Sequence, residues 1–328
     1  MEGEPAVSRN EKKERGPRQR GNRLGFWFFE TALRLFGLRG AYGLLYIVCS
    51  YYLLFDRAAV RAALAYTTRR FPGDGRVRQL ANAYRLFISQ GKTLIDRYYL
   101  ASGLGDFRVD LNGYDKVEEV LSESEQGFIL LTSHVGNWQV VMTFLEKMRK
   151  RIHLLMRPED NPAVKESLHI DGEDDMIKVI SPEQFLGGVV EMMNVIKDGD
   201  VVSIMGDRSY GYSSLNVSFL GEEARFPYGA FTIAAASGRP VVVLLSAKIS
   251  TRHYRIDIVD VLRPGYKGRK NKEEQLKVWV QQYAALVEAY LQAYPFQCFL
   301  FHDIWNRRRP SSSKLPAEQS DTRTKDRD

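Results

Sequence analysis

The chain has 328 residues, 44% of them hydrophobic, and its 47 Lys and Arg against 40 Asp and Glu give a formal net charge of +7. The length fits one large α/β domain or two small ones, and the apolar content is ample for a packed core. The charge excess is too small to indicate nucleic-acid binding, but it suits a surface that faces anionic lipid. The 2 cysteines and 5 histidines are scattered and show no metal-ligand spacing, so we expect no metal site.

Residues 1–23 are polar and rich in Arg and Lys, and we expect a disordered basic tail. From Leu24 the chain becomes dense in aromatic and aliphatic residues, so residues 24–70 are predicted to form a membrane-associated helical segment. Its uncharged run, 40–55, is shorter than the roughly 20 residues of a simple span. A cleaved signal peptide is disfavoured because no small-residue cleavage site follows this run.

Three interpretations of this segment stay open: a spanning helix, a helix lying in the membrane interface, and a buried helical hairpin. If the helix spans the membrane, the positive-inside rule places the arginine-rich tail on the cytoplasmic side. If it lies in the interface, the folded domain is cytoplasmic.

The pattern of residues 71–310 indicates one α/β domain, and the polar residues 311–328 a disordered tail. Strands are predicted at 127–132, 152–156, 177–180, 201–205, 241–249 and 254–262, and helices at 75–104, 137–150, 161–169, 184–197, 227–237 and 272–293. Strands that alternate with helices of this length imply βαβ units. We therefore expect a mixed, largely parallel sheet flanked by helices.

Polar clusters follow three of these strands, where the chemistry of parallel sheets is usually found. They are residues 133–139, 157–161 and 206–208. His134 lies between an apolar strand and the start of a helix, where Gly136 lets the backbone approach closely. A neutral imidazole there can take a proton from an alcohol or amine, and the alternative is a histidine that only caps or packs. The chain has neither the G-x-S-x-G elbow of serine hydrolases nor the G-x-G-x-x-G of dinucleotide enzymes.

The segment HVGNWQ (134–139) resembles the H-x-x-x-x-D/E motif of the lysophospholipid acyltransferase superfamily. Its nearest form is the HxGNWE of the late acyltransferases of bacterial lipid A synthesis. The stretches MGDRSYG (205–211) and VSFLGEEARFPYGAFTIAAASGRPVV (217–242) also resemble that family, and the resemblance extends over about residues 24–305.

This resemblance implies a glycerol-3-phosphate acyltransferase-like fold in a cell inner-membrane enzyme whose catalytic domain faces the cytoplasm. Such an enzyme moves a fatty acyl chain directly from an acyl carrier protein or coenzyme A thioester to a lipid hydroxyl or amine. A lipid A precursor is the default acceptor. No cofactor is expected, and the implied partners are the thioester donor, the lipid acceptor and the membrane.

The resemblance makes His134 the general base, but Gln139 stands where the family has a carboxylate. Three explanations are compatible with this departure. Asp207 supplies the carboxylate from another strand end, or Gln139, whose amide oxygen can still fix the imidazole tautomer, suffices because a thioester is a reactive donor. In the third, the protein is a lipid-binding relative that has lost its chemistry. The candidate catalytic residues are thus His134, Gln139 and Asp207.

Four further residues are candidates for substrate binding. Arg208 and Arg157 match phosphate groups bidentately, although salt bridges with neighbouring carboxylates would also explain them. Arg225, expected just before a helix, can face anions, and Asn137 either contacts substrate or only caps the helix that follows. The basic segment 303–309 suits a membrane surface, an acidic carrier protein or a solvated terminus.

Overall fold

The computed structural model describes residues 23–145, 150–156, 176–183, 188–208, 213–301 and 303–305. Both predicted tails, apart from Arg23, lie outside these ranges. The helix predicted at 161–169 and residues 306–309 of the basic segment lie outside them too.

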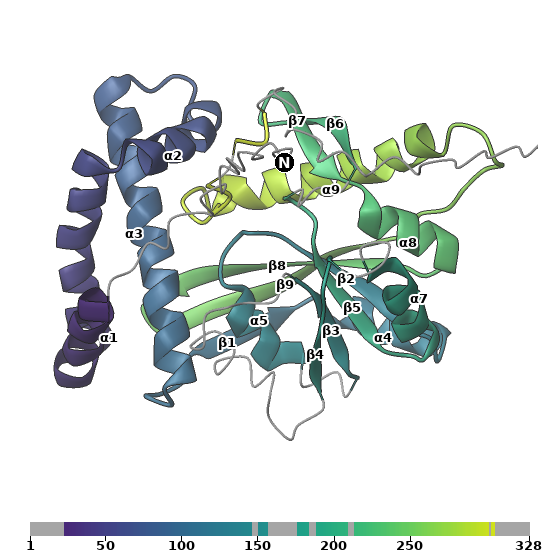
Figure 1. Cartoon of the computed structure of the whole chain (residues 1–328), viewed down its shortest axis with the longest axis horizontal. Coiled ribbons are helices and arrows are strands. Elements are labelled where there is room, and N and C mark those ends of the chain that lie inside the picture. Colours follow the sequence, from purple (N-terminus) through teal and green to yellow (C-terminus); the bar gives the residue numbers. More distant parts are fainter. Residues whose placement is uncertain are drawn as a thin grey trace, which may run out of the picture.

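A seven-stranded sheet forms the centre of the molecule, in the order β1-β9-β8-β2-β5-β3-β4 (Figure 1). Every neighbouring pair is parallel except β8 and β9, which are antiparallel. The strands are β1 (Arg108–Asn112), β2 (Phe128–Thr132), β3 (Ile152–Leu155), β4 (Ile177–Ile180), β5 (Val201–Met205), β8 (Val241–Ser250) and β9 (His253–Leu262). The mixed, largely parallel sheet predicted from the sequence is confirmed.

The central strand β2 shows why the apolar runs form this sheet. Its first four residues, Phe128 to Leu131, are completely buried, as expected for a parallel strand covered on both faces. Burying each such side chain contributes about 1.5–3 kcal/mol before the cost of ordering the chain.

Helices cover the sheet, and three of them pack side by side, with α8 between α7 and α9. The helices of the α/β part are α4 (Tyr114–Glu123), α5 (Trp138–Leu145), α7 (Val189–Lys197), α8 (Gly229–Ser237) and α9 (Lys272–Ala293). Gly238 ends α8 in the left-handed conformation, as its place after an apolar run predicts. Residues 146–149 and 184–187 of two predicted helices lie outside the described ranges.

Four elements were not predicted from the sequence: β1, α4 and the two strands of a hairpin, β6 (Ser214–Phe219) and β7 (Glu222–Pro227). The hairpin turns at Leu220 and Gly221, both with positive φ, as a tight two-residue hairpin requires. Leucine is unusual at such a turn position, so the sequence lacks the pattern that normally predicts a hairpin. Because β7 runs to Pro227, the next helix begins at Gly229 rather than at the predicted residue 227.

Three N-terminal helices, α1 (Arg23–Phe55), α2 (Arg57–Arg70) and α3 (Arg76–Ala101), stand together at one side of the sheet (Figure 1). The first, α1, is kinked at Gly37, whose φ of 63° is left-handed. It packs along α3 and buries Leu38, Tyr42 and Leu45. Among the described residues, 29–55 form the single helix long and apolar enough to cross a membrane.

A buried polar cluster ties these helices to the sheet. Asp96 on α3 has no exposed surface and accepts hydrogen bonds from the hydroxyls of Tyr42 on α1 and Tyr254 on β9. Lys248 on β8 forms an ion pair with it at 2.5 Å. Desolvation raises the pKa of Asp96 and lowers that of Lys248. The hydrogen bonds and the ion pair compensate the cost of burying the carboxylate, so α1 and α3 are fixed to the sheet.

Candidate active site

The ends of β2 and β5 bring His134 and Asp207 together. The two strands are parallel neighbours, and Thr132 at the end of β2 pairs with Met205 at the end of β5. His134 and Asp207 each lie two residues beyond these positions, so they occupy equivalent places at one edge of the sheet. The Nδ1 atom of His134 lies 2.7 Å from Oδ1 of Asp207, and the backbone N–H of His134 donates to Oδ2. Both carboxylate oxygens therefore contact one residue.

Exposure separates the two members of this pair. The side chain of Asp207 is 2% exposed, whereas that of His134 is 17% exposed. Because Nδ1 is directed at the carboxylate, Asp207 favours, for a neutral imidazole, the tautomer that carries its proton on Nδ1. Nε2 is then the unprotonated nitrogen and can accept a proton from a ligand.

The loop that carries His134 is fixed from two sides. Gly136 has a φ of +70°, and a Cβ there would lie 2.0 Å from the carbonyl oxygen of Ser246 on β8, so only glycine fits. On the other side the loop is bonded to the segment after α9. The N–H of Gly136 donates to the carbonyl of Gln297, at 2.9 Å, and the N–H of Phe299 to that of His134, at 2.7 Å. These contacts fix the backbone of the loop and so the position of the imidazole.

The carbonyl of Thr132, at the end of β2, connects α9 with the loop that carries Asp207. Tyr283, fully buried on that helix, donates a hydrogen bond of 2.7 Å to the carbonyl of Thr132. The N–H of Gly206 donates to the same carbonyl at 2.9 Å. A side chain at Gly206 would come too close to Leu131 and to the ring of Tyr283 unless these side chains shifted, so glycine lets β2, β5 and α9 pack closely here.

Gln139 and Asn137 are both buried at the start of α5. Asn137 is completely buried and caps α5: its Oδ1 accepts from the N–H of Gln139 at 3.2 Å, and its own N–H donates to Ser246 Oγ at 3.1 Å. Its Nδ2 lies 3.4 Å from the hydroxyl of Tyr254. Gln139 is buried in the first turn of α5. Neither residue is among those that line the cavity described below.

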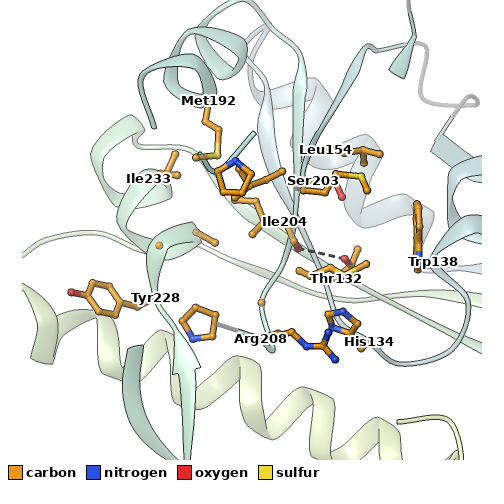
Figure 2. A pocket seen from close by; sticks show the side chains of 18 of the residues that line it. Thr132, His134, Trp138, Leu154, Met192, Ser203, Ile204, Arg208, Tyr228 and Ile233 are labelled. Atoms are coloured by element: carbon orange, nitrogen blue, oxygen red, sulfur yellow. Dashed lines mark hydrogen bonds between the residues drawn. The ribbon is translucent and has the colours of Figure 1, made fainter. Parts of the chain in front are cut away.

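The three candidate arginines differ in their relation to the site. Arg208 lies beside His134 (Figure 2), and its Nη2 donates to the carbonyl of Leu300. Arg157 lies outside the described residues. The sequence predicted Arg225 just before the start of a helix, and this prediction is wrong. Arg225 belongs to β7, where its Nε donates to Ser214 Oγ at 3.1 Å, and it is not among the cavity-lining residues.

A cavity of about 640 Å³ opens beside His134, within the size range of small-molecule sites. Figure 2 shows His134 and Arg208 close together at one end of the group of lining residues, with Met192 and Ile233 at the other. The wall is mostly apolar and includes Val141, Leu154, Val189, Met192, Ile204 and Ile233. The site therefore joins a polar end to an apolar chamber that suits a hydrocarbon chain.

Sequence reasoning missed some residues of this site. Tyr283 and Ser246 support the two loops from elements distant in sequence, and Arg97 on α3 lines the cavity. Trp138, the first residue of α5, also lines it. Ser246 lies in an apolar strand and Tyr283 on a long helix, where no local pattern distinguishes either residue from other core residues.

A proton-accepting pair at the end of parallel strands, beside an apolar chamber, can act on a hydroxyl or amine of a ligand that carries a hydrocarbon chain. The family model for bacterial lipid A biosynthesis acyltransferases matches residues 105–307, and the chain belongs to this family.

Among solved structures, the chain is similar to the 1-acyl-sn-glycerophosphate (LPA) acyltransferase PlsC from Thermotoga maritima, with 12% identity and a TM-score of 0.38. That alignment covers 76% of this chain and 96% of the other, and the likeness is too distant to transfer the role of any residue. No curated protein matches this chain at a significant level.

Proposed function

We propose that this protein transfers a fatty acyl chain from a thioester of acyl carrier protein or coenzyme A to a hydroxyl or amine of a membrane lipid. A precursor of lipid A is the first acceptor to consider, because the chain belongs to the lipid A acyltransferase family. The observation that carries the proposal is the contact of 2.7 Å between His134 and Asp207 at the polar end of an apolar cavity.

In the proposed reaction, Nε2 of His134 takes the proton of the acceptor hydroxyl while its oxygen attacks the thioester carbonyl. The tetrahedral intermediate collapses, the carbon–sulfur bond breaks, and the imidazolium returns the proton to the leaving thiolate. The products are an ester (or an amide from an amine) and a free thiol. Asp207 keeps the imidazole in the required tautomer and stabilises the imidazolium.

The apolar wall of the cavity is suited to hold the acyl chain, and the guanidinium of Arg208 to hold a phosphate group near His134. The alternative, a lipid-binding relative without chemistry, rested on Gln139 in place of the family carboxylate. The contact between the Asp207 carboxylate and the imidazole favours the enzyme, since an acidic residue from another loop already lies where the base needs one.

We further propose that the catalytic domain lies on the cytoplasmic side of the inner membrane, attached through α1. Five large apolar side chains of this helix are between 69% and 71% exposed: Leu35, Phe36, Ile47, Leu54 and Phe55. The opposite face packs on α3, which carries Arg85, Lys92 and Arg97. Because α3 is too charged for the bilayer core, this packing favours a helix lying in the interface over one that spans the membrane.

Acyl transfer by membranes that contain the protein tests the proposed function. Labelled acyl carrier protein and coenzyme A thioesters of several chain lengths are offered with a total lipid extract, and labelled lipids are separated afterwards. We expect a labelled lipid with at least one donor, which also identifies the donor class. Membranes without the protein are the control. No labelled lipid with any donor, from protein that is folded and membrane-bound, would contradict the proposal.

A further inference from the structure

A polar side chain lies in the apolar part of the cavity wall. Ser203, in the middle of β5, lines the cavity and is only 9% exposed. The residues that pair with it on the neighbouring strands are Leu130 on β2 and Leu154 on β3. Its neighbours along the chain, Val202 and Ile204, are apolar as well. A hydroxyl in such surroundings is unfavourable unless a hydrogen-bond partner reaches it.

The hydroxyl of Ser203 differs from the other hydroxyls of the cavity in having no partner in the protein. Thr132 donates to the carbonyl of Ile204 at 3.4 Å, and Thr232 donates to the carbonyl of Tyr228, one turn back on α8, at 3.2 Å. Within the described ranges, no residue forms a hydrogen bond with the side chain of Ser203. A serine hydroxyl both donates and accepts, so a ligand in the cavity can use it in either sense.

The strand register gives the depth of this hydroxyl below the imidazole. Met205 pairs with Thr132, and Ser203 precedes Met205 by two residues as His134 follows Thr132 by two. Figure 2 shows the same order, with Thr132 between His134 and Ser203. Because a strand rises about 3.3 Å per residue and the chain bends after Thr132, Ser203 lies on the order of 10 Å from the level of His134.

This depth translates into a position along an acyl chain. In the proposed reaction the thioester carbonyl lies beside His134, and the chain extends from there into the cavity. With C–C bonds of about 1.5 Å in a zigzag, an extended chain needs on the order of eight carbons to reach Ser203. In a chain of twelve carbons, the group opposite Ser203 therefore belongs to the half that is farther from the carbonyl, which we call the outer half.

We infer that Ser203 binds a hydroxyl group in the outer half of the acyl chain, so that the preferred donor carries a hydroxylated chain. The inference rests on the proposed function. A plain hydrocarbon leaves the hydroxyl of Ser203 buried and unpaired, whereas a hydroxylated chain restores the hydrogen bond that water supplies in the empty cavity. A site built to bond a ligand hydroxyl discriminates against the analogue that lacks it. Ser203 is thus a residue that determines specificity, without a part in the chemistry.

Binding of free fatty acids to the full-length protein in lipid nanodiscs tests this role. The probes are dodecanoic acid and two forms of it with one hydroxyl, in the outer half of the chain or next to the carboxyl group. Empty nanodiscs measure the uptake by lipid, which is subtracted. Free acids have no thioester and undergo no transfer, so their binding is read independently of catalysis. The acyl-transfer assay described above decides the proposed function separately.

We expect the natural protein to prefer the outer hydroxy acid, and Ser203→Ala to reduce its affinity relative to dodecanoic acid about tenfold, the weight of one hydrogen bond. The relative affinity of the acid with its hydroxyl next to the carboxyl should change less than about twofold. The matched control is Thr232→Val, which removes a cavity hydroxyl that is already bonded within α8. It should leave both relative affinities within about twofold. Comparing ratios between proteins cancels the different solubility of the acids in lipid.

The inference is overturned if Ser203→Ala has the same relative affinities as the natural protein, since Ser203 then only fills space or binds water. It is also overturned if only the acid with its hydroxyl next to the carboxyl depends on Ser203, or if no acid binds above the level of empty nanodiscs. Ser203→Cys, which keeps a side chain of similar shape with a weaker donor, gives a second reading. Its preference for the outer hydroxy acid should be intermediate, and a preference equal to that of serine would count against the hydrogen bond.

Discussion

Two histidine–aspartate pairs in this molecule have nearly the same geometry but different surroundings. His134 and Asp207 are 2.7 Å apart, and His253 and Asp110 are 2.8 Å apart, with histidine side chains 17% and 22% exposed. Asp207 is 2% exposed and Asp110 is 32% exposed. The second pair therefore has a carboxylate in contact with water, which screens its charge.

Their places on the sheet differ as well. His134 and Asp207 follow the carboxyl ends of two parallel strands, and His134 lines the cavity. His253 begins β9 and pairs with Arg108 at the start of β1, an edge strand. The comparison teaches that a histidine bonded to an aspartate is not itself a site. The buried carboxylate, the strand end and the adjoining cavity are what assign His134 to the chemistry.

The largest effect is expected from removing the imidazole. His134→Ala should lower acyl transfer by about 10⁴-fold, the upper end of what a positioned general base contributes. His253→Ala, the matched change at the other pair, should lower it less than about threefold. Initial rates at saturating donor measure both, with thermal melting to check the fold. Equal losses in the two variants would remove the distinction between the pairs.

The buried Asp96–Lys248 pair should affect stability rather than chemistry. Lys248→Met leaves the Asp96 carboxylate buried without its cation and should lower the free energy of unfolding by about 3–5 kcal/mol. Replacing both residues, as Asp96→Asn with Lys248→Met, should recover much of that loss, because no charge is left unpaired. Denaturant unfolding in detergent measures the three variants. A double variant as unstable as the single one would show that packing, not charge, holds the cluster.

The same pair predicts a pH dependence of stability. Because desolvation raises the pKa of Asp96 above 3.8 in the folded protein, rising pH removes the proton from the unfolded chain first. Stability is therefore lost as pH rises through the folded pKa. The pKa of Lys248 is lowered from 10.5, so falling pH protonates the unfolded chain first, and stability is lost as pH falls through the folded pKa.

The double variant lacks both groups and therefore both losses. The difference between its free energy of unfolding and that of the natural protein should move in favour of the variant as the pH approaches neutrality from either side. Unfolding curves at acidic, neutral and alkaline pH measure the difference between the two proteins. A difference that does not change with pH would contradict the prediction.

The smallest of these effects is expected on membrane attachment. Ile47→Asp with Leu54→Asp places two charges on the exposed face of α1 and should shift most of the protein from the membrane pellet to the supernatant, since each apolar side chain contributes about 1.5–3 kcal/mol. Val278→Asp, at a position 66% exposed on α9, is the control. Deleting residues 1–56 is a poorer test, because it also removes Tyr42 from Asp96. Unchanged sedimentation of the double variant would place the attachment elsewhere.

The sequence predicted six of the seven strands of the central sheet and the polar clusters after three of them, because apolar runs and strand ends are local features. It identified His134 and Asp207 as candidates but not their contact. That contact depends on β2 and β5 being neighbours, although β3 and β4 lie between them in the chain. Arg97 was missed because a lone arginine on an amphipathic helix has no distinguishing pattern. Arg225 was placed before a helix because the hairpin of β6 and β7 was not recognised.

The most direct test of the account compares Asp207→Asn with Gln139→Glu in the acyl-transfer assay. Asp207→Asn keeps the size of the side chain but removes the charge beside the imidazole, and should lower transfer about 10²–10³-fold. Gln139→Glu, which restores the family residue in the first turn of α5, should stay within about threefold of the natural protein. An Asp207→Asn variant of normal activity, or activity seen only with Gln139→Glu, would contradict Asp207 as the carboxylate that serves His134.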